Sequence, residues 1–265
     1  MNILYKDKHG CEIESSTGKY IYSKSHTEYK IILSTSTEID DINDKYKNIL
    51  LICESPSIEN NNYIYDNLNK FDLVLTCHKT FLDLNLDKIK FISLANTWID
   101  SCDHFIHNKT KNCSMILSDK KYTEGHLFRH TIASVIQSLN LNVNLFGNSY
   151  CKFNNKIETL KEFRFSIVIE NCKEDYYFSE KLIDCFLTGN VPIYWGCPSI
   201  NKFFNTKGMI IIDETNYIKK IKLLNENIYN HMLPHIKDNF EKALKYSNFN
   251  IKIDDNYVDN ILGFK

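Results

Sequence analysis

The stretch Phe163–Asp213 reads FRFSIVIENCKEDYYFSEKLIDCFLTGNVPIYWGCPSINKFFNTKGMIIID, and it decides the fold class. It begins with an apolar run, Arg164–Ile169, and a polar loop then leads to Ser179, which we expect to cap a helix that Gly189 closes. A second apolar run follows at Val191–Trp195. Short apolar runs that alternate with helices are typical of parallel strands covered on both faces. The stretch therefore predicts an α/β unit.

The same alternation extends over most of the chain. A helix is predicted at Glu124–Leu139, while the polar stretch Asp100–Lys111 predicts a linker and the Asn60–Asn62 tract a loop. We expect two Rossmann-like α/β units that face one another, residues 1–108 and residues 109–265, with a nucleotide bound at the carboxyl ends of parallel strands. Further strands are predicted at Tyr29–Leu33, Asn48–Cys53, Asp72–Thr76, Ile89–Ser93, Cys113–Leu117, Val143–Phe146 and Met209–Ile212.

The composition excludes several classes of protein. The 265 residues carry 32 basic and 33 acidic side chains, so the basic excess of a nucleic-acid-binding protein is missing. The chain has 8 glycines and neither a Gly-x-Gly-x-x-Gly nor a Walker-type loop, which argues against dehydrogenases and P-loop enzymes. No apolar run is long enough to span a bilayer, and the first residues do not resemble a signal peptide. The nine cysteines include no Cys-x-x-Cys pair, so we expect reduced thiols and a soluble protein in the cytoplasm of a bacterium or a virus-infected cell.

Charged and polar residues gather where the strand of the first stretch ends. Glu170 and Asn171 end the strand, and Glu180 and Lys181 open the next helix. Free amide groups at a helix start favour phosphate, so Lys181 is predicted to pair with a pyrophosphate and Glu180 to accept hydrogen bonds from ribose. Of the 32 basic residues only two are arginines, and a planar guanidinium suits phosphate, which makes Arg129 a further candidate.

The order of these residues resembles the donor-binding signature of the α1,3-fucosyltransferases of glycosyltransferase family 10, of the bacterial and viral type. The shared pattern is Glu-Asn, then Tyr-x-Ser-Glu-Lys-Leu-x-Asp, then Val-Pro-Ile-Tyr-Trp-Gly. The resemblance implies that Asn171, Tyr177, Glu180 and Lys181 hold a nucleotide diphosphate sugar. Cys172 departs from the small hydroxyl residue that is common after Glu-Asn in the family.

Two other stretches resemble the same family. Arg129 follows Ser118-Asp-Lys-Lys121 at the place where the family has an arginine that contacts the donor pyrophosphate. Glu54 stands in a Glu-Ser-Pro motif after a buried strand, and the resemblance implies that it is the catalytic base. Alone, such a glutamate is an ordinary turn residue. Residues 1–108 are then expected to be the acceptor-side domain and residues 109–265 the donor-binding domain.

The resemblance implies an inverting glycosyltransferase of the GT-B architecture. The expected reaction moves fucose from GDP-fucose to a hydroxyl of a glycan acceptor. No Asp-x-Asp motif for a diphosphate-bound metal is present, so no metal cofactor is expected and a divalent ion is at most stimulatory. His104 and His107, with Cys102 and Asp103 beside them, suggest metal ligands by type only, and we favour a structural role for them. Two alternatives stay open: a transferase of the same fold with another nucleotide sugar, and an inactive glycan- or nucleotide-binding module.

Overall fold

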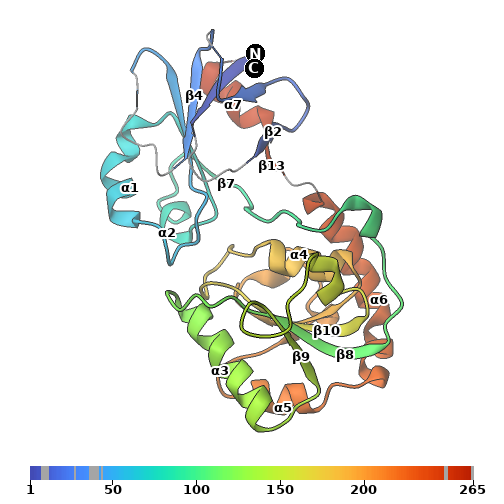
Figure 1. The fold of residues 1–265 in the computed structure, drawn as a ribbon. Helices are drawn as coiled ribbons and strands as arrows, with labels where there is room; N and C mark the ends of the chain where they lie inside the picture. Colours follow the sequence, from blue (N-terminus) through green and yellow to red (C-terminus); the bar gives the residue numbers. More distant parts are fainter. Residues whose placement is uncertain (7–11, 27, 36–41, 43, 248–249, 264–265) are drawn as a thin grey trace. The chain divides into compact units, whose positions relative to one another are not determined.

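The structure is a computed structural model that describes residues 1–265 except 7–11, 27, 36–41, 43, 248–249 and 264–265. The chain forms two compact units, one of Met1–Leu94 with Asn250–Lys265 and one of Ala95–Phe249 (Figure 1). Both are α/β units with a parallel sheet. The division predicted at residue 108 therefore differs from the structure in two ways: the first unit ends 14 residues earlier (108 − 94), and the end of the chain returns to it.

The first unit is built on a six-stranded parallel sheet in the order β3-β1-β4-β5-β6-β7. Side chains alternate along β5, so that Ile49 and Leu51 pack in one core and Leu50 in another on the opposite face. Helix α7 (Asp255–Leu262) covers the first face, and α1 (Asn61–Asn67) and α2 (Lys79–Leu82) cover the second. The strands are β1 (Asn2–Lys6), β3 (Ile21–Ser23), β4 (Ile31–Thr35), β5 (Lys47–Leu51), β6 (Leu73–Thr76) and β7 (Ile89–Phe91).

Two features of the first unit were not predicted. Residues 61–62 belong to α1 rather than to a loop, because the Asn60 side chain accepts a hydrogen bond from the Tyr63 amide and caps the helix. A two-stranded parallel sheet joins β2 (Ile13–Ser15) to β13 (Ile251–Ile253), near the opposite end of the chain. This pairing attaches the last residues to the first unit.

The second unit has a five-stranded parallel sheet in the order β12-β11-β10-β8-β9. Helix α3 (Glu124–Ser138) packs Phe128, Ile132 and Ile136 in the core on one face of β10, and α4 (Glu180–Leu187) packs in the core on the other. The strands are β8 (Lys111–Ile116), β9 (Val143–Phe146), β10 (Phe163–Ile169), β11 (Val191–Trp195) and β12 (Ile210–Ile211); α5 (Tyr217–Lys222) and α6 (Glu226–Ala243) complete the unit.

The stretch 100–111 is part of the second unit, so the prediction of a linker is wrong. The Lys109 side chain is buried and donates to the carbonyls of Leu160 and Thr188 and to Asn190 Oδ1, at 3.2, 2.8 and 3.0 Å. His104 and His107 each direct Nε2 to a backbone carbonyl. Within the described part of the chain, no group of three or more His, Cys, Asp or Glu side chains is arranged to hold a metal ion.

Candidate functional site

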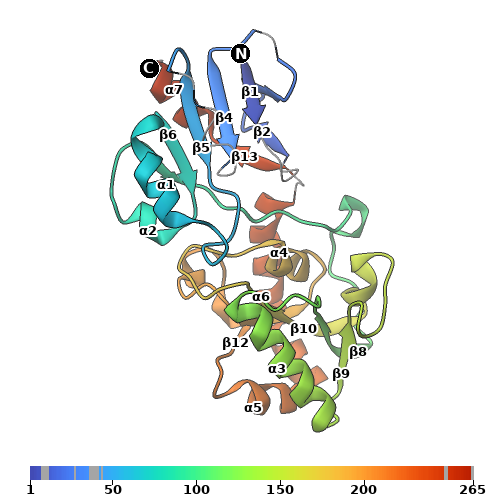
Figure 2. The same cartoon turned by 60° about the vertical axis from the view of Figure 1, so that its left-hand side comes forward.

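The candidate site lies where the central strands of the second sheet end. Strands β8, β10 and β11 are neighbours and run parallel, so their carboxyl ends meet along one edge. Helices α3 and α4 both begin on this side of the sheet (Figure 2), after Thr123 and after Ser179. In each case the side chain of the capping residue accepts a backbone hydrogen bond. Gly125 in the first turn of α3 donates its amide to the Asn171 carbonyl at 3.0 Å. A Cβ at Gly125 would lie 1.8 Å from the Glu170 carbonyl oxygen, so only glycine permits this approach.

Glu170 connects the end of β10 to the start of α4. Its carboxylate is fully buried and accepts from the Ser179 amide at 2.9 Å and from the Ser179 hydroxyl at 2.6 Å. Its own amide donates to the Trp195 carbonyl at 2.9 Å. A Cβ at Gly196 would lie 2.5 Å from Glu170 Cγ, which explains the glycine after Trp195. Glu170 therefore fixes the loop that precedes α4, and it was not among the predicted site residues.

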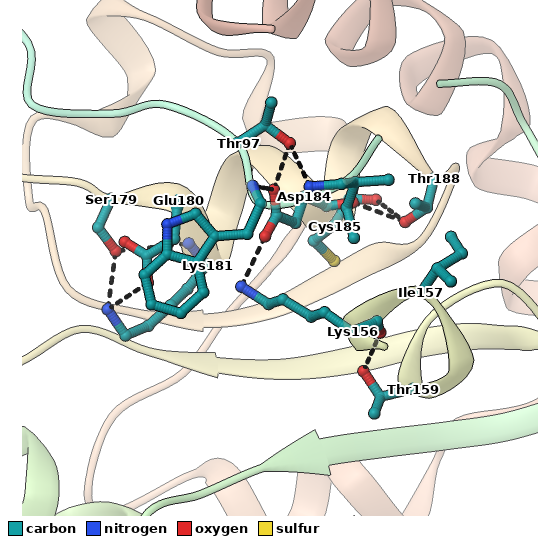
Figure 3. A network of polar contacts seen from close by, with 12 residues as sticks. Thr97, Lys156, Ile157, Thr159, Ser179, Glu180, Lys181, Asp184, Cys185 and Thr188 are labelled. Atoms are coloured by element: carbon teal, nitrogen blue, oxygen red, sulfur yellow. Dashed lines mark hydrogen bonds and ion pairs between the residues drawn. The ribbon is translucent and has the colours of Figure 1, made fainter. Parts of the chain in front are cut away.

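Glu180 and Lys181 occupy the first turn of α4 (Figure 3). Lys181 Nζ lies 3.0 Å from Ser179 Oγ, 3.2 Å from Glu180 Oε1 and 3.7 Å from Glu170 Oε2. Burial by itself raises the pKa of Glu180, but attraction to Lys181 and Lys156 and hydrogen bonding lower that pKa to about 2. Glu180 is therefore ionised at neutral pH and can only accept hydrogen bonds.

A buried carboxylate one turn further along α4 fixes the helix. Asp184 Oδ1 accepts from the Thr97 hydroxyl at 2.6 Å and from the Trp98 amide at 3.0 Å, and Oδ2 pairs with Lys156 Nζ at 2.6 Å (Figure 3). Burial raises the pKa of Asp184, and Lys156 opposes that shift. The ammonium of Lys156 also lies over the Trp98 ring, 4.8 Å from its centroid. The sequence analysis missed Lys156; Asp184 stood within the quoted motif without an assigned role.

Arg129 holds the end of β10. Its Nε and Nη2 donate to the Ile169 carbonyl at 3.0 and 2.5 Å, and Nη2 also donates to Asn171 Oδ1 at 2.9 Å. The residue is 6% exposed. To the described residues Nη1 makes no hydrogen bond. Two of the three guanidinium nitrogens, Nε and Nη2, thus donate to the protein.

His126 lies one turn before Arg129 and completes the cap of α3. Its Nδ1 accepts from the Thr123 amide at 3.2 Å, and its own amide donates to Thr123 Oγ1 at 3.3 Å. Burial lowers the pKa of His126, and cationic neighbours lower it further, to about 4; these neighbours are Arg129, Lys120, Lys181 and His130. The effect of these neighbours on His126 indicates a positive electrostatic potential at the N-terminus of α3, where an anion is favoured. The sequence analysis left His126 unassigned.

The structure thus brings four predicted site residues of the second unit together. Arg129, Asn171, Glu180 and Lys181 all lie at the ends of β10 or the starts of α3 and α4. Tyr177 is buried in the loop between β10 and α4, and its electrostatic influence reaches Arg129. The preceding residue, Tyr176, has a φ of 68°, and Ser199 Oγ accepts from its amide at 3.0 Å. This left-handed conformation gives the loop its shape.

Glu54 belongs to the first unit, where it follows β5 and is half-buried. Its backbone carbonyl accepts from His78 Nε2 at 2.9 Å. To the described residues its carboxylate makes no hydrogen bond or ion pair. The structure therefore places a carboxylate after a strand of the first unit, where the sequence analysis expected one.

Comparisons with known proteins identify the family. Residues 106–246 match the model of glycosyltransferase family 10 (fucosyltransferase), C-terminal part. An α-(1,3)-fucosyltransferase of Helicobacter pylori is 39% identical over 85 residues, which are 30% of this chain and 18% of that protein. A putative fucosyltransferase of Acanthamoeba polyphaga mimivirus is 36% identical over 75 residues, 27% of this chain and 12% of that protein. The aligned segments therefore span less than a fifth of these relatives.

Solved structures show the fold. A crystal structure of an α1,3-fucosyltransferase superposes with a TM-score of 0.60 at 18% identity, and it covers 92% of this chain and 81% of the other. A structure of an α1,3-fucosyltransferase with GDP-fucose gives a TM-score of 0.60 at 17% identity, over 98% of this chain and 90% of the other. The predicted α/β, GT-B-like fold is confirmed, and the resemblance noted in the sequence is confirmed by the family match. The chain belongs to glycosyltransferase family 10.

Proposed function

We propose that the chain is an inverting glycosyltransferase that moves fucose from GDP-fucose to a hydroxyl of a glycan acceptor. The observation that carries the proposal is the convergence of Arg129, Lys181 and the starts of α3 and α4 at the end of β10, around the electropositive position of His126. Such a position suits a diphosphate. Family membership supports the same chemistry, and one of the solved structures of the same fold is described as containing GDP-fucose.

In this proposal each predicted site residue of the second unit has a role in donor binding. Lys181 supplies its ammonium, and Arg129 supplies Nη1 and its charge, to the leaving diphosphate. The ionised carboxylate of Glu180 accepts hydrogen bonds from the ribose hydroxyls. Asn171, oriented by Arg129, and Tyr177 complete the wall of the site. Glu170 does not contact the donor but holds the loop that presents these groups.

Glu54 is the proposed general base. Its carboxylate takes the proton of the acceptor hydroxyl as the oxygen forms a bond to the anomeric carbon of fucose. The bond between that carbon and the diphosphate oxygen breaks, and GDP leaves from the opposite face, so the anomeric configuration inverts. The positive charges at the donor site stabilise the charge that develops on the leaving diphosphate, which is why we propose that no metal cofactor is required.

The donor is tested by thermal unfolding in the presence of nucleotide sugars, because a ligand that binds the native state raises its stability. GDP and GDP-fucose at about 100 times their dissociation constant are expected to stabilise the protein by about 2.7 kcal/mol. UDP-glucose and ADP-glucose at equal concentration are the matched controls. Stabilisation by a UDP-sugar alone would replace the proposed donor with another nucleotide sugar. GDP-fucose binding with no transfer to any member of an oligosaccharide panel would favour the inactive binding module.

A further inference from the structure

The loop that contains Glu54 is a tight turn, and a histidine from outside the turn binds its backbone at Glu54. The Ser55 carbonyl accepts from the amides of Ile58 and Glu59 at 2.9 and 3.2 Å, which closes the turn on itself. The side chains of Ser55 and Ser57 lie 3.1 Å apart and are hydrogen-bonded. None of these bonds involves the peptide group of Glu54. The Glu54 carbonyl is instead bound from another strand end, by His78.

His78 follows β6, the neighbour of β5 in the sheet, and is fully buried. Its amide donates to Thr76 Oγ1 at 3.0 Å, which fixes its backbone, and its ring stacks near Phe81 with 6.0 Å between centroids. Nε2 lies 2.9 Å from the Glu54 carbonyl oxygen, and Nδ1 lies 3.1 Å from Oδ1 of Asn61, at the start of α1. The imidazole therefore connects the end of β6, the loop after β5 and the first helix.

The contacts determine which ring nitrogen carries the proton. A backbone carbonyl only accepts hydrogen bonds, so Nε2 must be the donor toward Glu54. Burial lowers the pKa of His78, so the ring is neutral near pH 7 and Nδ1 is an acceptor. Oδ1 of Asn61 cannot donate to Nδ1, so rotating the amide group by half a turn, which exchanges Oδ1 and Nδ2, gives Nδ1 its N–H donor. A neutral, buried ring of fixed tautomer makes a rigid connection.

We infer that His78 is a positioning residue for the Glu54 base: its Nε2–H bond to the Glu54 carbonyl fixes the peptide from which the carboxylate projects. This inference rests on the proposed function, in which Glu54 removes a proton from the acceptor. A general base acts only within hydrogen-bond reach of that proton, and a displacement of about 1 Å costs on the order of 100-fold in rate. His78 belongs to the first unit, whereas the proposed donor-binding residues belong to the second.

The test compares His78→Leu with His78→Gln, each alone and combined with Glu54→Gln. Glutamine can place an N–H donor near the position of Nε2, and leucine cannot. His78→Leu is expected to lower kcat roughly 10- to 100-fold with the KM for GDP-fucose unchanged. His78→Gln is expected to keep kcat within about threefold of the wild type. In the Glu54→Gln background His78→Leu is expected to lower kcat further by less than about threefold, since residues that act as a unit are not additive.

Amide hydrogen exchange of residues 53–61 gives a second readout that does not need turnover. Exchange is expected to rise in His78→Leu and to stay near the wild-type rate in His78→Gln. The inference would be overturned by unchanged hydrogen exchange in His78→Leu or by equal losses of kcat in His78→Leu and His78→Gln. It would also be overturned if His78→Leu lowered kcat by the same factor in the Glu54→Gln background as in the wild type. Failure of the proposed function looks different: Glu54→Gln alone would then retain kcat, or GDP-fucose would not stabilise the wild type.

Discussion

The buried carboxylate of Glu170 accepts two hydrogen bonds from Ser179, one from its amide at 2.9 Å and one from its hydroxyl at 2.6 Å. The two residues stand at the end of β10 and at the cap of α4, so the contact closes the loop that contains Asn171 and Tyr177. Because Glu170 has no exposed surface, its charge is stabilised by these donors and by Lys181 rather than by water.

Glu170→Gln is expected to destabilise the second unit and weaken GDP binding together. The substitution removes the charge, so Ser179 and Lys181 lose a charged hydrogen-bond acceptor, at a cost of about 1.5–3 kcal/mol. Thermal unfolding and calorimetric titration with GDP measure the two effects. Glu241→Gln, on the exposed side of α6, is the matched control. Wild-type stability in Glu170→Gln would show that the Ser179 contact does not hold the loop.

Lys181→Ala and Arg129→Ala are each expected to weaken GDP binding roughly 10- to 150-fold, the equivalent of about 1.5–3 kcal/mol for a hydrogen bond to a charged group. Lys181→Ala is expected to lower the thermal midpoint only slightly, because Glu170 keeps both Ser179 donors, although Glu180 loses its nearest cation. Arg129→Ala also lowers the midpoint, since it leaves the Ile169 carbonyl without its donor. Lys219→Ala on α5 serves as the control. Unchanged GDP affinity in both variants would remove the phosphate assignment.

Chelation is expected to leave transfer in place. Lys181, Arg129 and two helix starts supply the positive charge that a diphosphate-bound metal would otherwise supply. Rates measured in EDTA and after addition of Mg²⁺ or Mn²⁺ are expected to differ by a few-fold at most, through product release. Complete loss of transfer in EDTA, restored by one equivalent of metal, would contradict the proposal.

The cap of α3 is expected to weaken in acid. The pKa of His126 is about 4 in the folded protein and about 6.5 when unfolded, so the fold favours the neutral ring. The stability due to neutral His126 is therefore complete above pH 6.5 and is lost as the pH falls from 6.5 toward 4. In His126→Gln the amide still accepts from Thr123, as in an ordinary capping box, but does not titrate. The thermal midpoint of the wild type should fall more steeply over this range than that of His126→Gln, and parallel curves would refute the assignment.

The sequence predicts most strands of the two large sheets well. Val143–Phe146 and Val191–Trp195 match the observed strands, and the other predicted strands overlap theirs with shifted ends. The helix at Glu124–Leu139 ends one residue earlier, at Ser138, and Ser179 caps α4 as predicted. Local apolar pattern and capping chemistry decide these elements, so one sequence suffices.

The pattern of apolar residues along the sequence does not show which distant strands pair with one another. Strand β2 pairs with β13, and Asp255 accepts from the Ser15 hydroxyl at 2.8 Å and the Thr17 hydroxyl at 2.5 Å, contacts between residues about 240 apart in the chain. The short strand β1, which pairs with β3 and β4, was also missed. The boundary of the first unit depends on these contacts.

Some contacts of the candidate site could be predicted from the sequence and others could not. Glu180 and Lys181 follow a helix cap, so their place beside a strand end was predicted from the sequence. Lys156 reaches Asp184 from a separate segment, and His78 reaches Glu54 from the next strand. These partners are set by tertiary structure, and a lysine or histidine in isolation carries no signal of them.

Glu54→Gln tests the central claim most directly. The substitution keeps the size of the side chain and its capacity for hydrogen bonding but removes the base, so GDP-fucose binding should be unchanged. A general base contributes roughly 10²–10⁴-fold to rate, and the loss should appear in kcat rather than in the KM for GDP-fucose. The measurement is the initial rate of fucose transfer to a glycan acceptor, with GDP affinity determined by calorimetry on the same preparation. A fall of kcat within that range, with wild-type GDP affinity, is the result predicted here; a Glu54→Gln protein with near-normal kcat would contradict it.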